Sequence, residues 1–512
     1  MATQSNVQLQ WVANASRRSG RLPLRSAFLF FLFLNCVYLL TSSGRVRTID
    51  EIDPVLQAES LVLRHSTAIP QAVNSGIYFG KRDQAGAPRS AWPFGHGLMI
   101  APWSAAGHWL ARLPGMPRDI SDLVISAATC WSNATYAAVT ATALFLIFFQ
   151  IAGEMAGRQR LAMVCSLVVA FATPLFVYSG WLYSEPVTAA LFVTAALLLF
   201  GTGREAGLPC ALAGGLLLGF SIHVRPANMV TVLIFIAASV FLNREDDEKG
   251  YAYRTAAILV CVMAVSGALY LARNYVFFGN AFDFGVPATA ENGKDIESWH
   301  NPLWRGVVGF LFSPGKSVFL FCPPMILGIL GLPHLWRRNR ALTVLAAAAP
   351  VCNLILYSFR TQWEGSYCYG PRYLLPGLML LCLPIAALLS DARLSDEVRW
   401  LRPVFWITVI VGFAVQAIGL STNIMEDMVR NHYYNANWDY QMNYSAITGQ
   451  LHLIWKYLHV APTAVGLGWD RWFVLLRSAG ANPALLSGII WSLLAGALLF
   501  GLLTWRSVRA SS

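Results

Sequence analysis

The sequence has few charged residues for its length. Only 12% of its 512 residues are Asp, Glu, Lys or Arg, whereas 56% are hydrophobic. An ordinary soluble domain carries about 25% charged residues. A chain this poor in charge could not keep its surface in water, so we expect a polytopic membrane protein with an all-α fold.

The sequence also lacks paired cysteines. Its nine Cys are scattered, without the short spacings that zinc sites and disulfide frameworks require. We expect them to be small buried apolar residues. Seven fall inside or beside apolar runs: Cys36, Cys130, Cys165, Cys210, Cys261, Cys352 and Cys382.

A continuous basic face is missing as well. The net charge is +11, but Lys and Arg occur in short runs beside apolar segments. This distribution is typical of membrane topology signals and not of a nucleic-acid surface. We therefore expect the protein to lie in a lipid bilayer and not to bind nucleic acid.

Apolar runs of the length needed to cross a bilayer occur about twelve times. The first follows Arg17, Arg18, Arg21 and Arg25, which is typical of an uncleaved signal anchor. The segment 208–243 is either two spans or a broken pair. The expected spans are 26–43, 124–151, 161–179, 186–201, 208–223, 227–243, 255–273, 317–335, 341–358, 372–390, 403–421 and 483–504.

The positive-inside rule orients these spans. With the tail 1–25 in the cytoplasm, every predicted inner loop is basic, and the tail after the last span (within 483–512) is also inside. The core then covers 26–421 and includes an outer loop, 44–123. The inner-loop residues are Arg158, Arg160, Arg204, Arg244, Lys249, Arg254, Arg337, Arg338, Arg340, Arg393, Arg399, Arg402, Arg506 and Arg509.

Three outer segments, 44–123, 274–316 and 422–482, are longer than connections between packed helices need to be. Within the first, 54–65 has the pattern of a short amphipathic helix on the membrane surface, and 97–113 fits a second. The third is rich in interfacial aromatics and is expected to lie on the bilayer. Those aromatics are Trp438, Tyr440, Trp455, Tyr457, Trp469 and Trp472.

Ionisable residues of both signs lie near the outer ends of the spans. Charges at membrane depth are costly unless they are paired or line a wet cavity, so their convergence indicates one polar site. Taken singly, Glu185 and Arg225 fit helix-end anchors equally well, and Lys81 and Arg82 fit a solvated turn. The set is Asp50, Glu51, Asp53, Lys81, Arg82, His96, Glu185, His223, Arg225, Arg305, Lys316, Arg360, Glu364 and Arg372.

Three carboxylates, Asp50, Glu51 and Asp53, follow the first span directly. Carboxylates that face basic residues at a membrane surface suggest chemistry on a lipid phosphate. If that substrate is a sugar carried on a polyprenyl phosphate, its leaving group is already a good anion. What remains is a carboxylate to deprotonate an acceptor hydroxyl and Arg to hold the phosphate. Asp53 stands before Pro54 and fits a helix start better than a catalytic role.

The sequence resembles the GT-C membrane glycosyltransferases that use lipid-phosphate sugars, in particular glycosyltransferase family 39 and the bacterial relatives of protein O-mannosyltransferases and aminoarabinose transferases. Asp50 and Glu51 match the family's acidic pair, and 92–102 matches its Pro- and Gly-rich entry to a second juxtamembrane helix. The stretches 309–316 and 369–376 resemble segments common in bacterial members. The resemblance implies a GT-C-like bundle with extracytoplasmic juxtamembrane helices.

The sequence departs from the family in two places. It has Pro93-Phe94-Gly95 where the aminoarabinose transferases have Lys-Pro-Pro, and we expect no soluble carbohydrate-binding domain after the last span. The resemblance implies Asp50 as the catalytic base, with Glu51 orienting the acceptor or a helper cation. The donor-phosphate candidates are Arg372, Lys316, Arg225 and Arg360, and further polar candidates are His96, Glu185 and Glu364.

The favoured hypothesis is an inverting hexosyl- or pentosyltransferase at the outer face of a bacterial inner membrane. It would move a sugar from a polyprenyl-phosphate donor to an extracytoplasmic lipid, glycan or protein acceptor. A polytopic transporter or lipid-linked-sugar flippase is the alternative, and an envelope scaffold is a third. We expect no metal, although Glu51 and Asp53 leave a divalent cation open.

Overall fold

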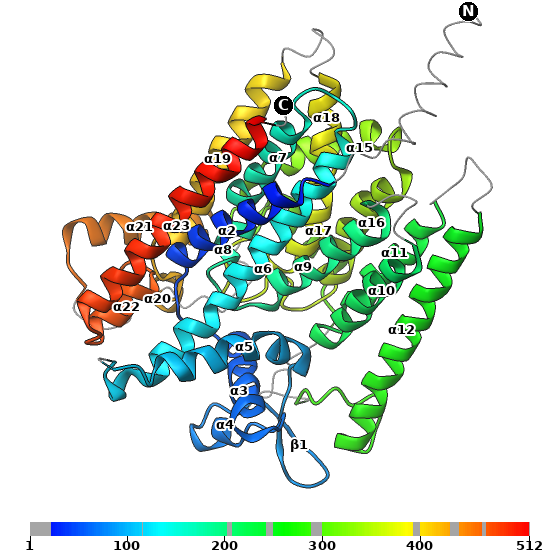
Figure 1. Cartoon of the computed structure of the whole chain (residues 1–512). Helices are drawn as coiled ribbons and strands as arrows, with labels where there is room; N and C mark the ends of the chain where they lie inside the picture. Colours follow the sequence, from blue (N-terminus) through cyan, green and yellow to red (C-terminus); the bar gives the residue numbers. More distant parts are fainter. Residues whose placement is uncertain are drawn as a thin grey trace, which may run out of the picture.

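The fold consists almost entirely of helices, arranged as a bundle with a cap at one end (Figure 1). The computed structural model describes residues 22–114, 116–201, 207–241, 249–287, 299–392, 400–430, 440–462 and 467–510. Within these residues, nine helical segments are long and apolar enough to cross a membrane. The expectation of an all-α polytopic membrane protein is thus confirmed. The predicted tail up to residue 21, together with Arg204, Arg244, Arg393, Arg399 and Trp438, lies outside the described residues.

Nine of the expected spans correspond to these long segments. They are α2 (Leu24–Thr41), η1 with α6 (Arg118–Ile120, Ser121–Ile151), α9 with η2 (Ser184–Ala196, Leu197–Gly201), α10 (Gly207–Val224), α12 (Lys249–Phe278), α16 (Arg340–Ser358), η4 with α17 and α18 (Arg372–Leu374, Leu375–Leu381, Pro384–Ala392), α19 (Leu401–Ser421) and α23 (Pro483–Ala510).

The other three expected spans are built from shorter helices. In 161–179, α7 (Arg158–Ala172) ends before Pro174, and α8 (Leu175–Tyr178) follows it. In 317–335, Pro323 and Pro324 separate α14 (Val318–Phe321) from α15 (Met325–Trp336), because Pro cannot donate within a helix. The span expected at 227–243 is the short helix α11 (Asn228–Ser239), which is separate from α10, so the segment 208–243 is two helices.

The first and last helices of the bundle lie side by side. Helix α2 packs along α23, and the hydroxyl groups of Ser26 and Ser507 are 2.8 Å apart. Since Ser26 is near the start of α2 and Ser507 near the end of α23, the two helices run in opposite directions. The start of α2 and the end of α23 therefore lie at the same end of the bundle (Figure 1). The cap lies at the other end.

The cap is formed by the segment after α2. It contains α3 (Ile49–Arg64), α4 (Pro70–Asn74), the antiparallel hairpin of β1 (Gly80–Arg82) and β2 (Pro88–Ser90), and α5 (Phe94–Leu110). Helices are therefore present at the expected 54–65 and 97–113, but α3 begins five residues earlier, and α5 is predominantly apolar and not amphipathic. Asp53 is consequently inside α3 and fully buried, which corrects the expectation that it starts the helix.

Two glycines explain the Pro- and Gly-rich stretch 92–102. A Cβ added at Gly95 would lie 2.4 Å from the carbonyl oxygen of His223, at the end of α10. A Cβ added at Gly97 would lie 2.7 Å from Cβ of Gln57 in α3. Only a residue without a side chain lets α5 approach both neighbours this closely. The motif thus joins the cap to the bundle.

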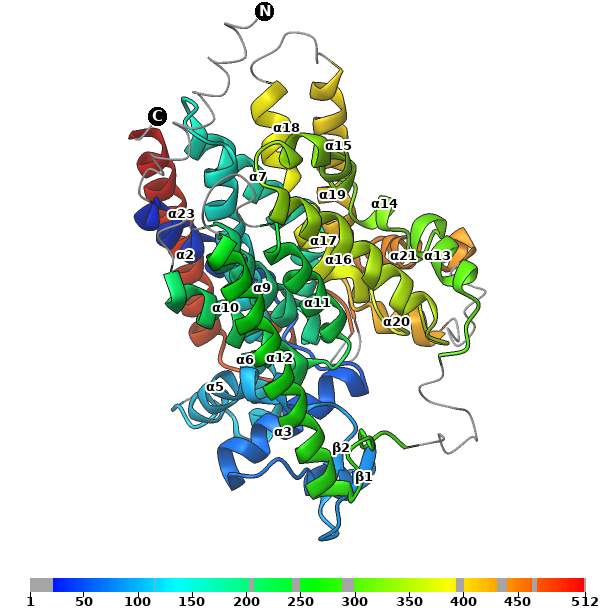
Figure 2. The ribbon, with the colours of Figure 1, turned by 90° about the vertical axis from the view of Figure 1, so that its right-hand side faces the viewer.

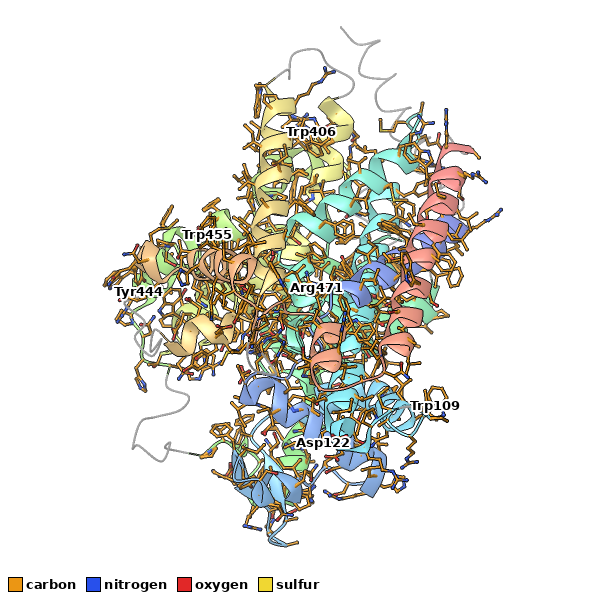
Figure 3. The ribbon with its side chains drawn as sticks, turned by 90° about the vertical axis from the view of Figure 1, so that its left-hand side faces the viewer. Trp109, Asp122, Trp406, Tyr444, Trp455 and Arg471 are labelled. Carbon is orange, nitrogen blue, oxygen red and sulfur yellow. The ribbon has the colours of Figure 1, made fainter. Side chains whose placement is uncertain are left out.

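The long segment 422–482 lies beside the bundle together with α13 (Leu303–Phe312). It contains α20 (Ile424–Arg430), η7 (Met442–Tyr444), α21 (Ala446–His459) and α22 (Trp472–Ser478). Figure 3 shows Tyr444 and Trp455 on this projecting part. Trp455 is exposed, as expected of an interfacial aromatic, whereas Trp472 is buried against Trp131. The expectation of a uniformly interfacial loop is therefore wrong for Trp472.

Candidate functional site

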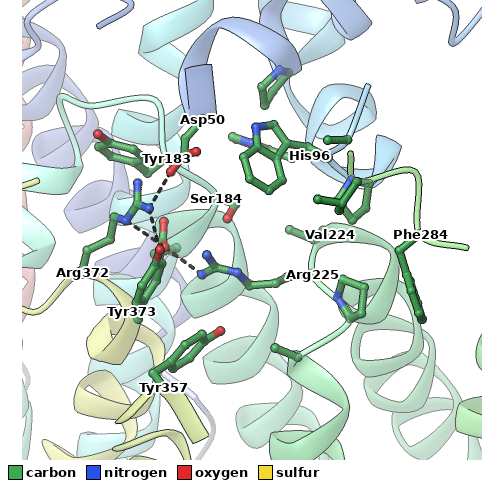
Figure 4. A pocket seen from close by; sticks show the side chains of 18 of the residues that line it. Asp50, His96, Tyr183, Ser184, Val224, Arg225, Phe284, Tyr357, Arg372 and Tyr373 are labelled. Atoms are coloured by element: carbon green, nitrogen blue, oxygen red, sulfur yellow. Dashed lines mark hydrogen bonds and ion pairs between the residues drawn. The ribbon is translucent and has the colours of Figure 1, made fainter. Parts of the chain in front are cut away.

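A pocket lies where the cap meets the bundle (Figure 4). Its volume is about 290 Å³, comparable with pockets that hold small ligands. Residues of α3 and α5 form its cap side, and the ends of several bundle helices form the rest. Its ionisable lining residues are Asp50, His96, Glu185, Arg225, Arg360 and Arg372. Six residues expected at one polar site therefore do converge on one pocket.

Asp50 and Arg372 form an ion pair inside this pocket. Nη2 of Arg372 donates to Oδ2 of Asp50 at 2.5 Å. Burial alone would raise the pKa of Asp50, but the charge and hydrogen bond of Arg372, with smaller contributions from Arg360 and Arg225, hold it below its ordinary value. Asp50 is therefore ionised at neutral pH.

Glu185 links two of the three guanidinium groups. Its Oε1 accepts from Nη1 of Arg225 at 2.8 Å and lies 3.6 Å from Nε of Arg372. Three guanidinium groups, those of Arg225, Arg360 and Arg372, thus face two carboxylates, those of Asp50 and Glu185. With His96 neutral, this set carries one net positive charge, which suits a ligand with a single negative charge.

Tyr373 separates the three guanidinium groups. The guanidinium carbons of Arg225, Arg372 and Arg360 lie 4.8, 4.8 and 5.2 Å from the centre of its ring. The ring stacks on Tyr357, with centroids 4.7 Å apart. Cation–π contact compensates part of the repulsion among like charges. The aromatic ring therefore allows three guanidinium groups to gather around one pocket.

Lys316 supports the segment that carries Arg372 and does not line the pocket. Its Nζ donates to the carbonyl of Cys368 at 2.9 Å, and its side chain is buried. The hydroxyls of Tyr183 and Tyr178 donate to the carbonyls of Tyr367 and Tyr369, each at 2.8 Å. Three side chains thus satisfy the buried backbone of 367–369 just before η4. The structure gives Lys316 this contact instead of the expected place in a phosphate site.

Glu51 points away from the pocket, into a buried ion-pair network. It accepts from the backbone N–H groups of Arg47 and Leu182, at 2.6 and 3.0 Å. Asp470 accepts from Nη2 of Arg47 at 2.6 Å and pairs with Nε of Arg45 at 2.8 Å. The expected role of Glu51 toward the acceptor does not fit this placement. It joins the start of α3 to the segment before α9.

Two further acidic candidates also lie off the pocket lining. Asp53 is buried and accepts from the hydroxyl of Ser90 at 2.6 Å. Burial raises its pKa to about 7, the Ser90 hydrogen bond lowers it, and the Asp50 charge adds to the increase. Glu364 lies in the turn after α16 and is absent from the residues that line the pocket.

His96 lines the pocket and is buried. Burial lowers its pKa to about 3, with a further contribution from Arg225, so the ring is neutral at physiological pH. Among the described residues, its Nε2 has no hydrogen-bond partner. A neutral imidazole can accept a hydrogen bond from a hydroxyl or donate one to an oxygen.

The carboxylates expected as possible cation ligands, Glu51 and Asp53, are engaged elsewhere. Glu51 is paired with Arg47 and backbone amides, and Asp53 with Ser90. Among the described residues, no group of three or more His, Cys, Asp or Glu could hold a metal ion. Metal independence stays a prediction for experiment.

Sequence reasoning missed the residues that position the charges. Tyr373 and Tyr183 contact the guanidinium of Arg372, with ring centres 4.8 and 4.2 Å from its carbon. Tyr373 directly follows Arg372 and Tyr183 precedes Glu185 by two residues, so proximity in sequence was an available signal. Nothing in the sequence marks Asp470, which lies 423 positions from Arg47.

Comparison with solved structures finds similarity to two proteins. ArnT from Cupriavidus metallidurans matches with 14% identity and a TM-score of 0.43, over 99% of this chain and 78% of ArnT. The form of ArnT bound to undecaprenyl phosphate matches with 15% identity and a TM-score of 0.40, over 95% and 76%. The Archaeoglobus fulgidus oligosaccharyltransferase matches with 11% identity and a TM-score of 0.47, over 86% of this chain and 60% of that one.

No protein-family model and no curated protein matches the sequence.

Proposed function

We propose that the protein is an inverting glycosyltransferase that moves a sugar from a polyprenyl-phosphate carrier to an acceptor hydroxyl. The observation that carries this proposal is the ion pair of Asp50 with Arg372 in a pocket that three guanidinium groups line. A carboxylate and a phosphate-binding site side by side are what this transfer requires.

The guanidinium groups of Arg225, Arg360 and Arg372 hold the donor phosphate. A phosphodiester between lipid and sugar carries one negative charge, which balances the single net positive charge of the pocket residues. Arg suits this role because its planar fork donates several hydrogen bonds to phosphate oxygens. Glu185 keeps two of the forks, those of Arg225 and Arg372, in place by its carboxylate.

Donor binding also activates the base. In the unliganded pocket Arg372 lowers the pKa of Asp50, which makes the carboxylate a weak base. A phosphate competes with Asp50 for the hydrogen bond of Arg372. Once the phosphate has taken it, the pKa of Asp50 rises and the carboxylate becomes a stronger base. The donor would therefore bind before the acceptor is activated.

The transfer is a single displacement. Asp50 removes the proton of the acceptor hydroxyl while that oxygen forms a bond to the anomeric carbon of the sugar. The bond from this carbon to the phosphate oxygen breaks, and its electron pair leaves with the lipid phosphate. The guanidinium groups stabilise the negative charge that develops on this phosphate. Attack opposite the leaving group inverts the anomeric configuration.

The pocket faces the extracytoplasmic side of a bacterial inner membrane. The basic residues at the start of α7, the end of α15 and the end of α23 lie at the end of the bundle opposite the cap (Figure 1). The positive-inside rule assigns that end to the cytoplasm. The cap and the pocket are then outside, where a lipid-linked donor meets an acceptor.

The test uses the full-length protein in proteoliposomes with a panel of polyprenyl-phosphate sugars and envelope extracts as acceptors. Wild type should transfer a sugar, and Asp50→Asn should lose at least about a hundredfold in turnover. Asp122→Asn is the matched control, because Asp122 is exposed on α6 (Figure 3). Near-normal turnover by Asp50→Asn would overturn the assignment of the base.

The same panel tests the chemical class. Release of lipid phosphate without movement of intact lipid-linked sugar across the bilayer supports a transferase. Transbilayer movement of an unchanged lipid-linked sugar, with no transfer by wild type, would support the flippase alternative.

A further inference from the structure

A second cleft adjoins the pocket. It is lined by Lys81, Asn280, Phe282 and Asp283, and it shares Phe284 and Val286 with the pocket. Because Phe284 and Val286 line both cavities, the two lie next to each other along the segment 282–286. Lys81 belongs to β1, and Figure 2 shows the β1–β2 hairpin beside the end of α12.

The hairpin holds this cleft in a fixed shape. The backbone N–H of Gln84 donates to the carbonyl of Phe277 at 2.8 Å, and its side chain donates to the carbonyls of Tyr275 and Val276. These carbonyl groups belong to the last turn of α12. The carbonyl groups of a last turn have no hydrogen-bond donors within their own helix. The guanidinium of Arg89 lies 4.1 Å from the ring centre of Phe277.

An ion pair forms the polar wall of the cleft. Nζ of Lys81 lies 3.0 and 2.9 Å from the two carboxylate oxygens of Asp283, and the N–H of Gly285 donates to the same carboxylate at 2.9 Å. The Lys81 and Asp283 side chains are 37% and 25% exposed, so both present polar atoms to the cleft. Lys81 was expected in a solvated turn; it lies in β1 and pairs with Asp283 while its side chain remains partly exposed.

An exposed aromatic ring forms the apolar wall. Phe282 is 73% exposed and Phe284 is 42% exposed, although both are large and apolar. Exposed apolar patches that are rimmed by polar residues mark interaction sites. A ring face beside an ion pair matches a sugar, which has an apolar C–H face and a rim of hydroxyls that both donate and accept.

The polar wall argues against the prenyl chain of the donor as the occupant. Burying the Lys81–Asp283 pair under a hydrocarbon chain would remove water from two charges without replacing its hydrogen bonds. Sugar hydroxyls would replace them.

We propose that this cleft binds a second sugar unit of the acceptor, and therefore that the acceptor is a glycan chain. This inference rests on the proposed function for the pocket itself. The terminal hydroxyl of the glycan reaches Asp50, and the preceding sugar packs on Phe282 with its hydroxyls on Lys81 and Asp283. The cleft thus selects acceptors of two or more sugars over a single sugar.

The test measures binding separately from transfer. Oligosaccharides of one to six units, from partial hydrolysis of envelope polysaccharide, are added to the full-length Asp50→Asn protein in nanodiscs, and saturation-transfer NMR reports their affinity. Oligosaccharides should bind more tightly than single sugars. Phe282→Ala and Asp283→Asn should each weaken oligosaccharide binding by about fivefold or more, without changing single-sugar binding.

Matched variants give the controls. Phe282→Tyr keeps a ring face and should bind as the parent does. Arg82→Ala removes a neighbouring exposed cation, which donates to Gly86 outside the cleft, and should also bind normally. Thermal unfolding checks that each variant is folded; if Phe282→Ala is unfolded, Phe282→Leu, which keeps apolar volume without a ring, replaces it.

Equal binding by the parent and the ring-less variant would overturn the inference, as would affinity that does not depend on glycan length. A loss of affinity for the polyprenyl-phosphate donor in Phe282→Ala, with glycan binding unchanged, would assign the cleft to the lipid and also overturn it. Failure of sugar transfer by wild type, with length-dependent glycan binding intact, would contradict the proposed function while leaving the glycan site supported.

Discussion

Nη2 of Arg372 lies 2.5 Å from Oδ2 of Asp50, although the two residues are 322 positions apart in the sequence. The pair brings the start of α3 in the cap against η4 in the bundle. The positive charge of Arg372 balances the negative charge of Asp50. The pair also places Asp50 beside the cations that are proposed to hold the phosphate. Both the position and the strength of the base therefore depend on one contact.

Arg372→Lys should weaken donor binding while the protein stays folded. A lysine keeps the charge but cannot donate to Asp50, lie near Glu185 and stack on Tyr373 at once. We expect KM for the polyprenyl-phosphate sugar to rise about ten- to a hundredfold. Arg82→Lys is the control, because Arg82 is an exposed cation of the hairpin. An unchanged KM would remove Arg372 from the phosphate site.

Lys316→Met should lower stability and only indirectly affect transfer. The substitution removes the donor to the buried carbonyl of Cys368, and a buried acceptor left without a partner costs about 1–3 kcal/mol. Thermal unfolding in detergent measures this loss. Lys81→Met, which breaks a partly exposed pair, should cost less, about 1 kcal/mol or below. Equal losses would contradict the supporting role of Lys316.

Asp470→Asn should be among the most destabilising single changes. The carboxylate pairs with both Arg45 and Arg47, all three buried, so its removal leaves buried positive charge poorly compensated. Loss of one partner of a buried pair costs about 3–5 kcal/mol. Asp391→Asn, which disturbs the partly exposed pairs of Asp391 with Arg338 and His334, is the comparison and should cost about 1 kcal/mol or less. A smaller effect for Asp470→Asn would mean that the network is not required for folding.

Asp53 should make stability fall as pH rises through the mildly acidic range. Its pKa is about 7 in the folded protein, against an ordinary value of 3.8. Between these values the folded state holds a proton that the unfolded state has lost. The contribution of Asp53 to the free energy of unfolding therefore decreases from about pH 4 to pH 7.

Thermal unfolding of wild type and Asp53→Asn from pH 4 to pH 8 isolates this contribution. His96, with a pKa lowered to about 3, acts with the opposite sign, since unfolding then takes up a proton below its ordinary value of 6.5. It is present in both proteins and cancels in the difference. The stability gained by Asp53→Asn relative to wild type should grow with pH; a constant difference would show that Asp53 titrates normally.

The positions of the spans and of the polar site follow from local properties of the sequence. Runs of apolar residues identify helices that cross the bilayer, and the neighbouring Arg and Lys set their direction. Two of the three shorter segments differ because Pro174, Pro323 and Pro324 interrupt helices that hydrophobicity alone would continue. Hydrophobic length thus predicts that a segment crosses, but not whether it crosses as one helix.

The sequence by itself determined that this is a polytopic helical membrane protein, and that several charges, Asp50 and Arg372 among them, meet at one end of it. Only the tertiary structure decided which of them face the pocket. Consecutive residues of a helix point about 100° apart, so α3 directs Asp50 into the pocket and Glu51 toward Leu182 and Arg47. Lys316 likewise meets a backbone carbonyl instead of the pocket, because its neighbours in space come from distant parts of the chain.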